Sequence, residues 1–332
     1  MLAVRNYGIG KIAVDEVAQP VPGPEEVLIR VAYGGICGSD LHIYRKGMFV
    51  KNLPETMGHE FIGFVEQPGE AARGIKAGDT VSGDPRVSCG SCSWCKSGCH
   101  NLCPDLSFIG EIAPGCFAEY ITMHQSKLIR IPPHVDLRQG ALVEPLAVAL
   151  YLLEKSQLDG NKTLGIIGAG PIGLLSAAAA KELYGSPRIT VVDLNEKRLK
   201  TARLLGVNEI LPVMPRQQAE QADVVIEAVG AEETFRGALG WLKPQGRLIM
   251  VGLFESQAFI DLNEILYKEI NITGVNAYKR KHLEQAVDFL ANRKVDLTPV
   301  ISHIISLNQA ESAFSMLAAG NSDAVKVLLK PQ

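Results

Sequence analysis

Residues 164–183 read LGIIGAGPIGLLSAAAAKEL, and their pattern indicates the class of fold. A short apolar run is followed at once by three glycines and then by a segment rich in alanine and leucine, which predicts a strand, a tight turn and a helix. Gly168, Gly170 and Gly173 give the spacing G-x-G-x-x-G. The first glycine permits the turn, the second lets the backbone approach a pyrophosphate, and the third lets the helix pack on the strand.

Asp193 ends the next predicted strand, 20 residues beyond Gly173. A diphosphate is expected at the helix N-terminus, where unpaired N–H groups favour anions. Asp193 can accept hydrogen bonds from a ribose 2′-hydroxyl and repels a 2′-phosphate, so we expect NAD rather than NADP. A turn without a ligand is the alternative, but the order of strand, glycines, helix, strand and aspartate argues against it. The expected cofactor-binding residues are Gly168, Gly170, Pro171, Ile172, Gly173 and Asp193.

The sequence that follows keeps alternating between strands and helices. Residues 189–193 (ITVVD), 222–230 (ADVVIEAVG) and 247–254 (RLIMVGLF) read as strands, and 196–206 and 234–242 read as helices. Such alternation builds a parallel, doubly wound sheet of the α/β class. We therefore expect a dinucleotide-binding Rossmann domain over residues 147–278.

The sequence before residue 146 has a different texture. Short β segments, such as 27–33 (VLIRVAY), 61–66 and 80–82, are separated by glycine and proline, which predicts an irregular, barrel-like β domain. After residue 278 we expect a helix over 282–294, a strand over 299–307 and a helix over 311–320. The predicted catalytic domain is discontinuous and covers residues 1–146 and 279–332.

Composition narrows the class of protein. The chain has 332 residues and a net charge of −3, without a long run of one sign, so we expect no nucleic-acid partner. No apolar run reaches the roughly 20 residues that a membrane span needs, and the first residues lack the apolar core of a secretory signal. Seven cysteines are then best interpreted as reduced and cytoplasmic, with metal binding favoured over disulfides.

Four of these cysteines form a compact cluster. Cys89, Cys92, Cys95 and Cys103 follow the spacing C-x2-C-x2-C-x7-C, inside a lobe of about residues 86–104. Four thiolates can close a tetrahedral shell around one Zn²⁺ and leave no position for water or substrate, which makes such a site structural. Free or disulfide-bonded cysteines are the alternative, which the regular spacing disfavours. Any chemistry must lie elsewhere.

A second metal site is suggested by scattered residues. Cys37, His59 and the carboxylates Glu60 and Glu144 would supply the mixed ligands of an open, catalytic zinc site. Taken one at a time, each has an ordinary explanation: Cys37 as a small buried side chain, His59 as a packed or surface residue, and Glu60 as a strand charge. Residue type and spacing alone do not choose between these explanations.

The chain resembles the zinc-dependent medium-chain dehydrogenase family over essentially its whole length. Gly58-His59-Glu60, followed by Gly63 and Gly69, is similar to the zinc signature of that family, and the four-cysteine lobe matches its structural zinc loop. The resemblance implies a GroES-like irregular β-barrel catalytic domain and a catalytic zinc at Cys37 and His59, with Glu60 and Glu144 assigned jointly. It also implies that Ser39 and His42 relay the substrate proton to solvent.

The implied activity is that of an oxidoreductase, a polyol dehydrogenase in the broad sense. Zinc polarises the oxygen of a secondary alcohol of a polyol or sugar acid, and a hydride passes reversibly to NAD, leaving a ketone. GICGSDLHIY and EPLAVAL resemble sorbitol and L-idonate dehydrogenases, whereas PGCFAEY resembles L-threonine 3-dehydrogenases, which are the main alternative. A non-catalytic, ligand-sensing relative is a second alternative. The family also implies a homo-dimer or homo-tetramer, with two zinc ions per chain.

Several other residues keep more than one interpretation. Polyol dehydrogenases often carry arginine where this chain has Asn276-Ala277-Tyr278. Residues 279–281 (KRK) either meet an anionic group of a substrate or simply begin a solvated helix. Pocket walls are the expected role, by resemblance, of Tyr44, Phe49 and Phe108, and Cys99 and Cys116 are expected to bind no metal.

Overall fold

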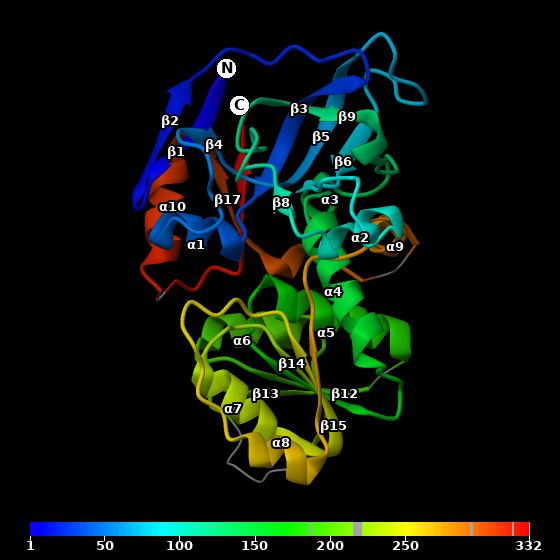
Figure 1. Cartoon of the computed structure of the whole chain (residues 1–332), viewed down its shortest axis with the longest axis vertical. Coiled ribbons are helices and arrows are strands. Elements are labelled where there is room, and N and C mark those ends of the chain that lie inside the picture. Colours follow the sequence, from blue (N-terminus) through cyan, green and yellow to red (C-terminus); the bar gives the residue numbers. More distant parts are fainter. Residues whose placement is uncertain (186, 215–220, 293–294, 321, 332) are drawn as a thin grey trace. The chain divides into compact units, whose positions relative to one another are not determined.

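The computed structural model describes residues 1–185, 187–214, 221–292, 295–320 and 322–331 (Figure 1). The chain forms two compact units. The first contains Met1–Glu144, Lys279–Asn292 and the chain from Ile301 onward, and the second contains Pro145–Tyr278 and a short segment that ends at Val300. Sequence reasoning assigned that segment to the first domain. In the structure its one-turn helix, Thr298–Val300, contacts two helices of the second unit, α5 and α6.

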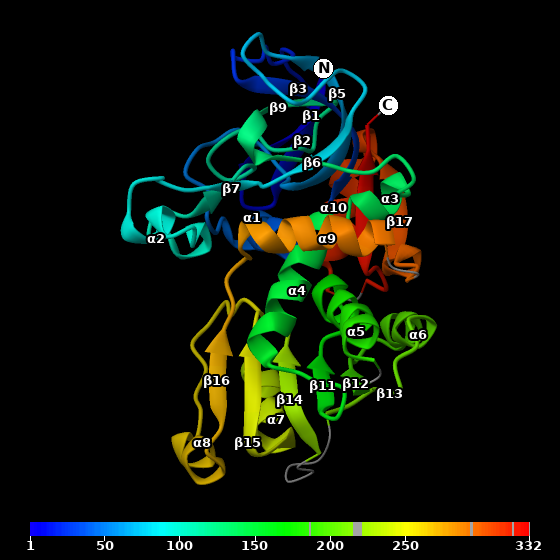
Figure 2. The ribbon, with the colours of Figure 1, turned by 90° about the vertical axis from the view of Figure 1, so that its right-hand side faces the viewer.

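The second unit is built on a sheet of six parallel strands in the order β13, β12, β11, β14, β15, β16 (Figure 2). The strands are β11 Thr163–Ile167, β12 Arg188–Val192, β13 Glu209–Leu211, β14 Ala222–Glu227, β15 Leu242–Met250 and β16 Asn271–Gly274. The helices are α4 Val143–Ser156, which continues from the first unit, α5 Pro171–Tyr184, α6 Glu196–Leu204, α7 Glu232–Trp241 and α8 Leu262–Lys268. The predicted doubly wound sheet is confirmed.

The order of these strands fixes where a ligand can bind. Strands added after β11 first extend the sheet through β12 to β13, and the chain then returns to the other side of β11 with β14. In open parallel sheets a crevice forms at such a reversal, outside the carboxyl ends of the strands. β11, β12 and β14 are almost wholly buried, because their apolar β-branched residues are covered by helices on both faces.

The first unit is an irregular β structure. A seven-stranded sheet has the order β10, β6, β5, β3, β18, β17, with β9 also paired to β3, and a three-stranded sheet has the order β2, β1, β4. Its strands are β1 Leu2–Gly8, β2 Lys11–Glu16, β3 Glu26–Gly35, β4 Glu55–Thr56, β5 Glu60–Pro68, β6 Thr80–Gly83, β7 Arg86–Val87, β8 Ser107–Phe108, β9 Tyr120–His124, β10 Leu128–Arg130, β17 Ile301–Ser306 and β18 Lys326–Lys330. Its helices are α1 Gly38–Lys46, α2 Ser93–Lys96, α3 Leu137–Gly140, α9 Arg280–Asn292 and α10 Ala310–Ala318.

The segments after residue 278 take up the predicted secondary structure. α9 covers the expected helix from residue 282, whose last residues, 293–294, lie outside the described residues. β17 and α10 follow as the expected strand and helix. β18 then pairs antiparallel with the end of β3, where Leu328 lies opposite Gly35 and Leu329 opposite Gly34.

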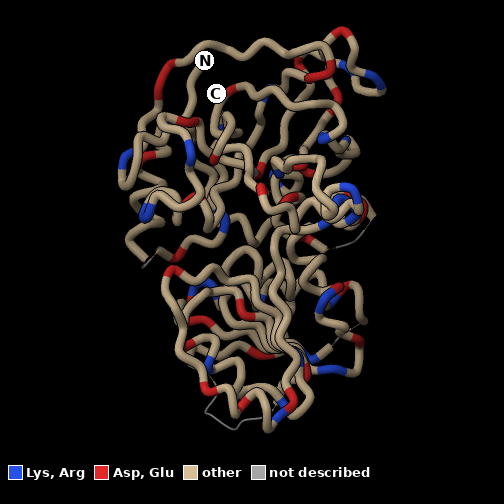
Figure 3. Tube along the Cα trace, in the orientation of Figure 1, with Lys and Arg blue, Asp and Glu red and all other residues tan. Residues whose placement is uncertain are grey.

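Each unit has its own apolar core. In the first, Phe61, Phe117 and Phe314 are fully buried among the aliphatic residues of the large sheet, and the rings of Phe117 and Phe314 meet edge to face with centroids 6.2 Å apart. In the second, α7 covers the sheet with Phe235, Leu239 and Trp241. Lys and Arg are interspersed with Asp and Glu in both units (Figure 3). No helix among the described residues has the length and apolar character needed to cross a membrane.

Gly165 of β11 provides a test of the packing in the second unit. A Cβ at this position would lie 2.6 Å from Cζ3 of the buried Trp241 ring, so we expect Gly165→Ala to lower the free energy of unfolding by about 1–3 kcal/mol. Urea denaturation measures the change. Gly274→Ala, at an exposed position of the same sheet with no atom within 4 Å of the added Cβ, is the control. Equal stability of the two variants would contradict the packing described for β11.

Candidate metal and nucleotide sites

The glycine turn lies between β11 and α5, at the carboxyl end of the central strand. Gly168 adopts φ +103°, and a Cβ on Gly173 would lie 1.9 Å from the carbonyl oxygen of Gly168, so both positions require glycine. Gly170 is the N-cap of α5 and Pro171 is its first residue, while a Cβ on Gly170 would meet no atom within 4 Å. The backbone in front of this helix is therefore open to a pyrophosphate.

Asp193 is held beside the turn by backbone groups. Its Oδ2 accepts a hydrogen bond of 2.7 Å from the N–H of Ala169, and its Oδ1 accepts one of 2.7 Å from the N–H of Asn195. Asn195 in turn caps α6. These bonds fix a carboxylate next to the glycine turn, where the expected cofactor presents its ribose. The structure thus brings together all six residues that the sequence indicated for the nucleotide.

The four-cysteine lobe has the geometry of a metal site. The sulfur atoms of Cys89, Cys92, Cys95 and Cys103 all lie within 4.8 Å of one another. Backbone N–H groups of Cys89, Cys92 and Cys95 each point at a sulfur of this set over 3.4 Å. The N–H groups of Ser91 and Cys92 lower the pKa of Cys89 to about 6, which favours the thiolate form that binds a metal. α2 supplies Cys95 and the N-cap Cys92 (Figure 1).

A second group joins three residues that are far apart in the sequence. β3 and β5 pair antiparallel with Gly35 opposite Glu60, so Cys37, two residues after β3, comes next to His59 and Glu60 at the start of β5. One donor atom from each of Cys37, His59 and Glu60 lies within 4.8 Å of the others. A Cβ on Gly35 would lie 2.4 Å from Oε2 of Glu60, so only glycine leaves room for this carboxylate. Thiolate, imidazole and carboxylate are the ligands that zinc prefers, at about 2.0–2.3 Å.

Asp40 orients the imidazole of this group. Its Oδ2 accepts a hydrogen bond of 2.8 Å from the N–H of Cys37, and its Oδ1 lies 3.6 Å from Nδ1 of His59. Burial by itself lowers the pKa of His59, but the negative charge of Asp40, helped by Cys37, raises this pKa well above its usual range. A carboxylate beside Nδ1 favours the proton there, which would leave the lone pair of Nε2 available to a metal.

Lys326 is a site residue that the sequence did not indicate. It is 1% exposed, and its Nζ lies 2.6 Å from Oε2 and 2.9 Å from Oε1 of Glu60. Burial lowers its pKa, but Glu60, Cys37 and Glu144 outweigh burial and raise it. The only signal in the sequence is one lysine inside the apolar run 324–329 (AVKVLL), and a strand pattern does not tell whether such a lysine points into the core.

The remaining predicted residues lie nearby but outside the three-residue group. Glu144, near the start of α4, is buried at 5% exposure and carries charge that reaches Lys326. Ser39 and His42 are half-buried in α1, directly after Cys37. The structure therefore places Glu60, and not Glu144, with Cys37 and His59.

The three expected pocket walls differ in their surroundings. Phe108 packs its ring against His59 with centroids 5.7 Å apart, whereas Tyr44 packs against Phe314 and Phe49 is exposed. Arg280 donates to the carbonyl oxygens of Lys127 and Leu128, so its guanidinium links α9 to β10. Sequence reasoning also missed Glu111, a buried carboxylate that accepts bonds from Ser107 Oγ and the N–H of Phe108 and whose charge interacts with His59.

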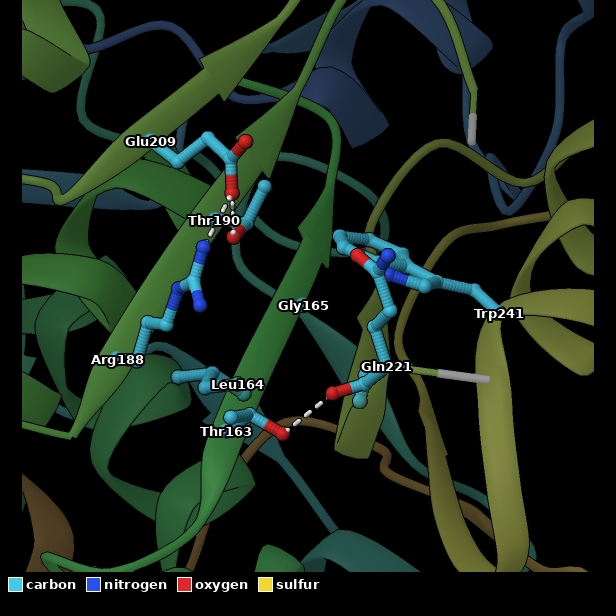
Figure 4. A pocket seen from close by; sticks show the side chains of 9 residues that line it. Thr163, Leu164, Gly165, Arg188, Thr190, Glu209, Gln221 and Trp241 are labelled. Atoms are coloured by element: carbon cyan, nitrogen blue, oxygen red, sulfur yellow. Dashed lines mark hydrogen bonds and ion pairs between the residues drawn. The ribbon is translucent and has the colours of Figure 1, made fainter. Parts of the chain in front are cut away.

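A pocket of about 290 Å³ lies at the amino ends of the strands of the nucleotide sheet (Figure 4). It is lined by the first residues of β11, β12 and β14 and by Trp241, and its walls are linked by Thr163 Oγ1 donating to the carbonyl of Gln221 over 2.7 Å. Gly168 and Asp193 lie at the carboxyl ends of the same strands. The pocket is therefore separate from the nucleotide site.

Comparison with known proteins agrees with this arrangement. Residues 23–133 match the family model of the alcohol dehydrogenase GroES-like domain, and residues 171–292 match that of the zinc-binding dehydrogenases. A sorbitol dehydrogenase of Halalkalibacterium halodurans is 33% identical, covering 99% of this chain and 98% of its own length. An L-threonine 3-dehydrogenase of an Enterobacter species is 31% identical, covering 95% of each chain.

The same likeness appears among solved structures. A zinc-binding dehydrogenase from Sinorhizobium meliloti, bound to NADP, superimposes with a TM-score of 0.92 at 33% identity and 99% coverage of both chains. The two family models match successive parts of the chain, and the alignment with the sorbitol dehydrogenase runs over nearly its full length. The chain therefore belongs to the zinc-dependent medium-chain dehydrogenase family.

Proposed function

We propose that this protein is a zinc- and NAD-dependent oxidoreductase that reversibly oxidises a secondary hydroxyl of a polyol or sugar acid to a ketone. The observation that supports it most is the group of Cys37, His59 and Glu60, whose donor atoms lie within 4.8 Å of one another. A non-catalytic relative would have no need to keep a thiol, an imidazole and a carboxylate together in this way.

The chain's own residues divide the work. Cys37, His59 and Glu60 hold the catalytic zinc, with Glu144 as a second carboxylate close by, and the four cysteines of the lobe hold the structural zinc. When bound, the zinc supplies Lewis acidity to the substrate oxygen, and the nicotinamide accepts the hydride. Gly168, Gly170, Pro171, Ile172 and Gly173 receive the pyrophosphate, and Asp193 binds the ribose hydroxyls.

Ser39 and His42 are the proposed route for the substrate proton. Both lie in the first turns of α1, which begins directly after Cys37. A hydroxyl can donate and accept in turn, and an imidazole changes its protonation near neutral pH, so the two can pass a proton toward solvent.

Charge near the metal group bears on the substrate. Among the described residues, four buried carboxylates surround or adjoin this group and one buried lysine opposes them: Asp40, Glu60, Glu111, Glu144 and Lys326. With the Cys37 thiolate and the Zn²⁺ that the group would hold also counted, these groups carry two net negative charges, and such an excess disfavours a substrate that carries its own carboxylate or phosphate. A neutral polyol is therefore our first choice, ahead of a sugar acid. L-Threonine, whose ammonium group offsets its own carboxylate, is the second candidate, and the stretch Gly115-Cys116-Phe117 favours it.

Assembly and location complete the proposal. β16 stands at one edge of the nucleotide sheet, and the neighbouring apolar side chains Phe259, Leu262, Leu266 and Tyr267 are exposed. An edge strand beside an apolar surface favours pairing with a second copy, so we propose a homo-dimer or a homo-tetramer. A cytoplasmic location would keep the seven cysteines reduced for metal binding.

A substrate panel tests the function. We expect NADH formation with neutral polyols such as sorbitol, weaker turnover with aldonates and sugar phosphates, and a higher kcat/KM with NAD⁺ than with NADP⁺. Absorbance at the NADH band measures each rate. Rapid turnover of L-threonine, with none on polyols or aldonates, would replace the proposed substrate class by the second candidate.

Two cysteine variants separate the two metal sites. We expect two zinc ions per chain in the wild-type protein. Cys37→Ser should lose one zinc and all turnover while the unfolding temperature stays nearly unchanged. Cys103→Ala should lose the other and unfold much more easily, because structural sites supply up to ~10–16 kcal/mol of folding free energy. Elemental analysis and calorimetry measure these changes, and full activity of Cys37→Ser would contradict the mechanism.

The raised pKa of His59 predicts a pH dependence for zinc binding. Below this pKa a proton competes with the metal, so zinc affinity should reach a plateau only above it and fall as the pH is lowered. Asp40→Asn removes the charge that holds the pKa up, so the plateau should begin at a lower pH, with an affinity about 10–100-fold weaker. Chelator competition at a series of pH values tests this, with the cysteine lobe as internal reference. A plateau that begins at the same pH would show that Asp40 does not set the protonation of His59.

A further inference from the structure

Lys326 uses its ammonium group entirely within the metal site. Its Nζ donates to both oxygens of Glu60, over 2.6 Å and 2.9 Å, and to the carbonyl oxygen of Ile36 over 2.9 Å. An ammonium has three N–H groups, so these contacts employ all of them. Ile36 precedes Cys37, and the lysine therefore joins the two chain segments that carry the proposed zinc ligands.

Lys326 and Glu60 form a fully buried ion pair, which is a costly way to stabilise a fold. Lys326 and Glu60 are 1% and 0% exposed. Taking two charges out of water is expensive, and apolar residues of similar size often serve a fold equally well. β18 is already anchored to β3 by the pairing of Leu328 and Leu329, which are both fully buried. An aliphatic residue at position 326 would fit such a strand, so the charge itself needs another explanation.

The charge balance of the metal group provides that explanation. A Zn²⁺ ion with the Cys37 thiolate, the Glu60 carboxylate and a neutral His59 has no net charge. Lys326 adds one positive charge at hydrogen-bond distance from Glu60. At that separation a unit charge changes the energy of a neighbouring ion by several RT even at the effective dielectric of a protein.

We propose that Lys326 is a positioning residue that holds the Glu60 carboxylate and offsets its charge, so that the group holds its zinc less tightly and the ion keeps more of its Lewis acidity. The inference rests on the proposed zinc site at Cys37, His59 and Glu60. Loss of the lysine leaves the full charge of Glu60 directed at the metal. Without the lysine, Cys37, His59 and Glu60 would hold a zinc ion more tightly, and the ion would supply weaker Lewis acidity to the substrate oxygen.

The experiment compares four variants in the intact, zinc-loaded protein. In Lys326→Met, loss of zinc from the catalytic group to EDTA should slow by at least about tenfold, and kcat should fall with a smaller change in KM. Lys326→Arg should restore both values toward those of the wild type. Lys326→Gln keeps a donor without the charge and should behave like Lys326→Met, which preserves the test if Lys326→Met does not fold. Lys330→Met, at an exposed position of the same strand, is the control.

A second readout shows that the lysine acts through Glu60. In protein loaded with Co²⁺, Lys326→Met should change the visible absorption of the ion at the catalytic group, while the lobe spectrum stays constant. In a Glu60→Gln background, Lys326→Met should have no further effect on zinc loss. Zinc loss from Lys326→Met that is as fast as from the wild type, or faster, would overturn the inference. A wild-type chain that binds only the lobe zinc would instead overturn the proposed function.

Discussion

The antiparallel pairing of β3 with β5 is the interaction on which the rest of the reactive group depends. It places Gly35 opposite Glu60, and the missing side chain of Gly35 leaves the space that the carboxylate fills. Cys37 then follows as the first turn of α1 begins, next to His59. Because the register of a strand pair is fixed by its buried faces, a shift of one residue would move Glu60 to the opposite face and dissolve the group.

The two metal groups illustrate opposite solutions to the same coordination problem. In the lobe, four sulfurs from one short loop fill every position, and backbone N–H groups point at three of them. In the other group, three different donors come from the N-cap of α1 and the start of β5, which leaves a position for a substrate oxygen. The first arrangement stabilises the protein, and the second can carry chemistry. Two buried charges act on the ligands of this second group: Asp40 lies beside His59, and Lys326 pairs with Glu60.

The sequence predicted well those features that are local along the chain. The glycine turn with Asp193 and the cysteine spacing each lie within one supersecondary unit, so residue type and spacing were sufficient. Cys37, His59 and Glu60 needed the family resemblance, because their proximity depends on strand pairing. Lys326 was missed because 266 residues separate it from Glu60 and its strand pattern is ordinary. Arg280 was expected either to meet an anionic substrate group or to begin a solvated helix, but it donates to backbone carbonyls. The segment ending at Val300 belongs to the second unit because it packs on α5 and α6.

The sequence distance between Glu60 and Lys326 also orders events during synthesis. The cysteine lobe spans fifteen residues and can close around its metal as soon as they have left the ribosome. The buried carboxylate of Glu60 receives its counter-ion only after 266 more residues have been added, including the whole nucleotide sheet. A nascent chain can therefore complete its cysteine lobe long before Glu60 meets the ammonium group that pairs with it. Assembly of that centre becomes one of the late steps of folding, because contacts between distant residues form slowly.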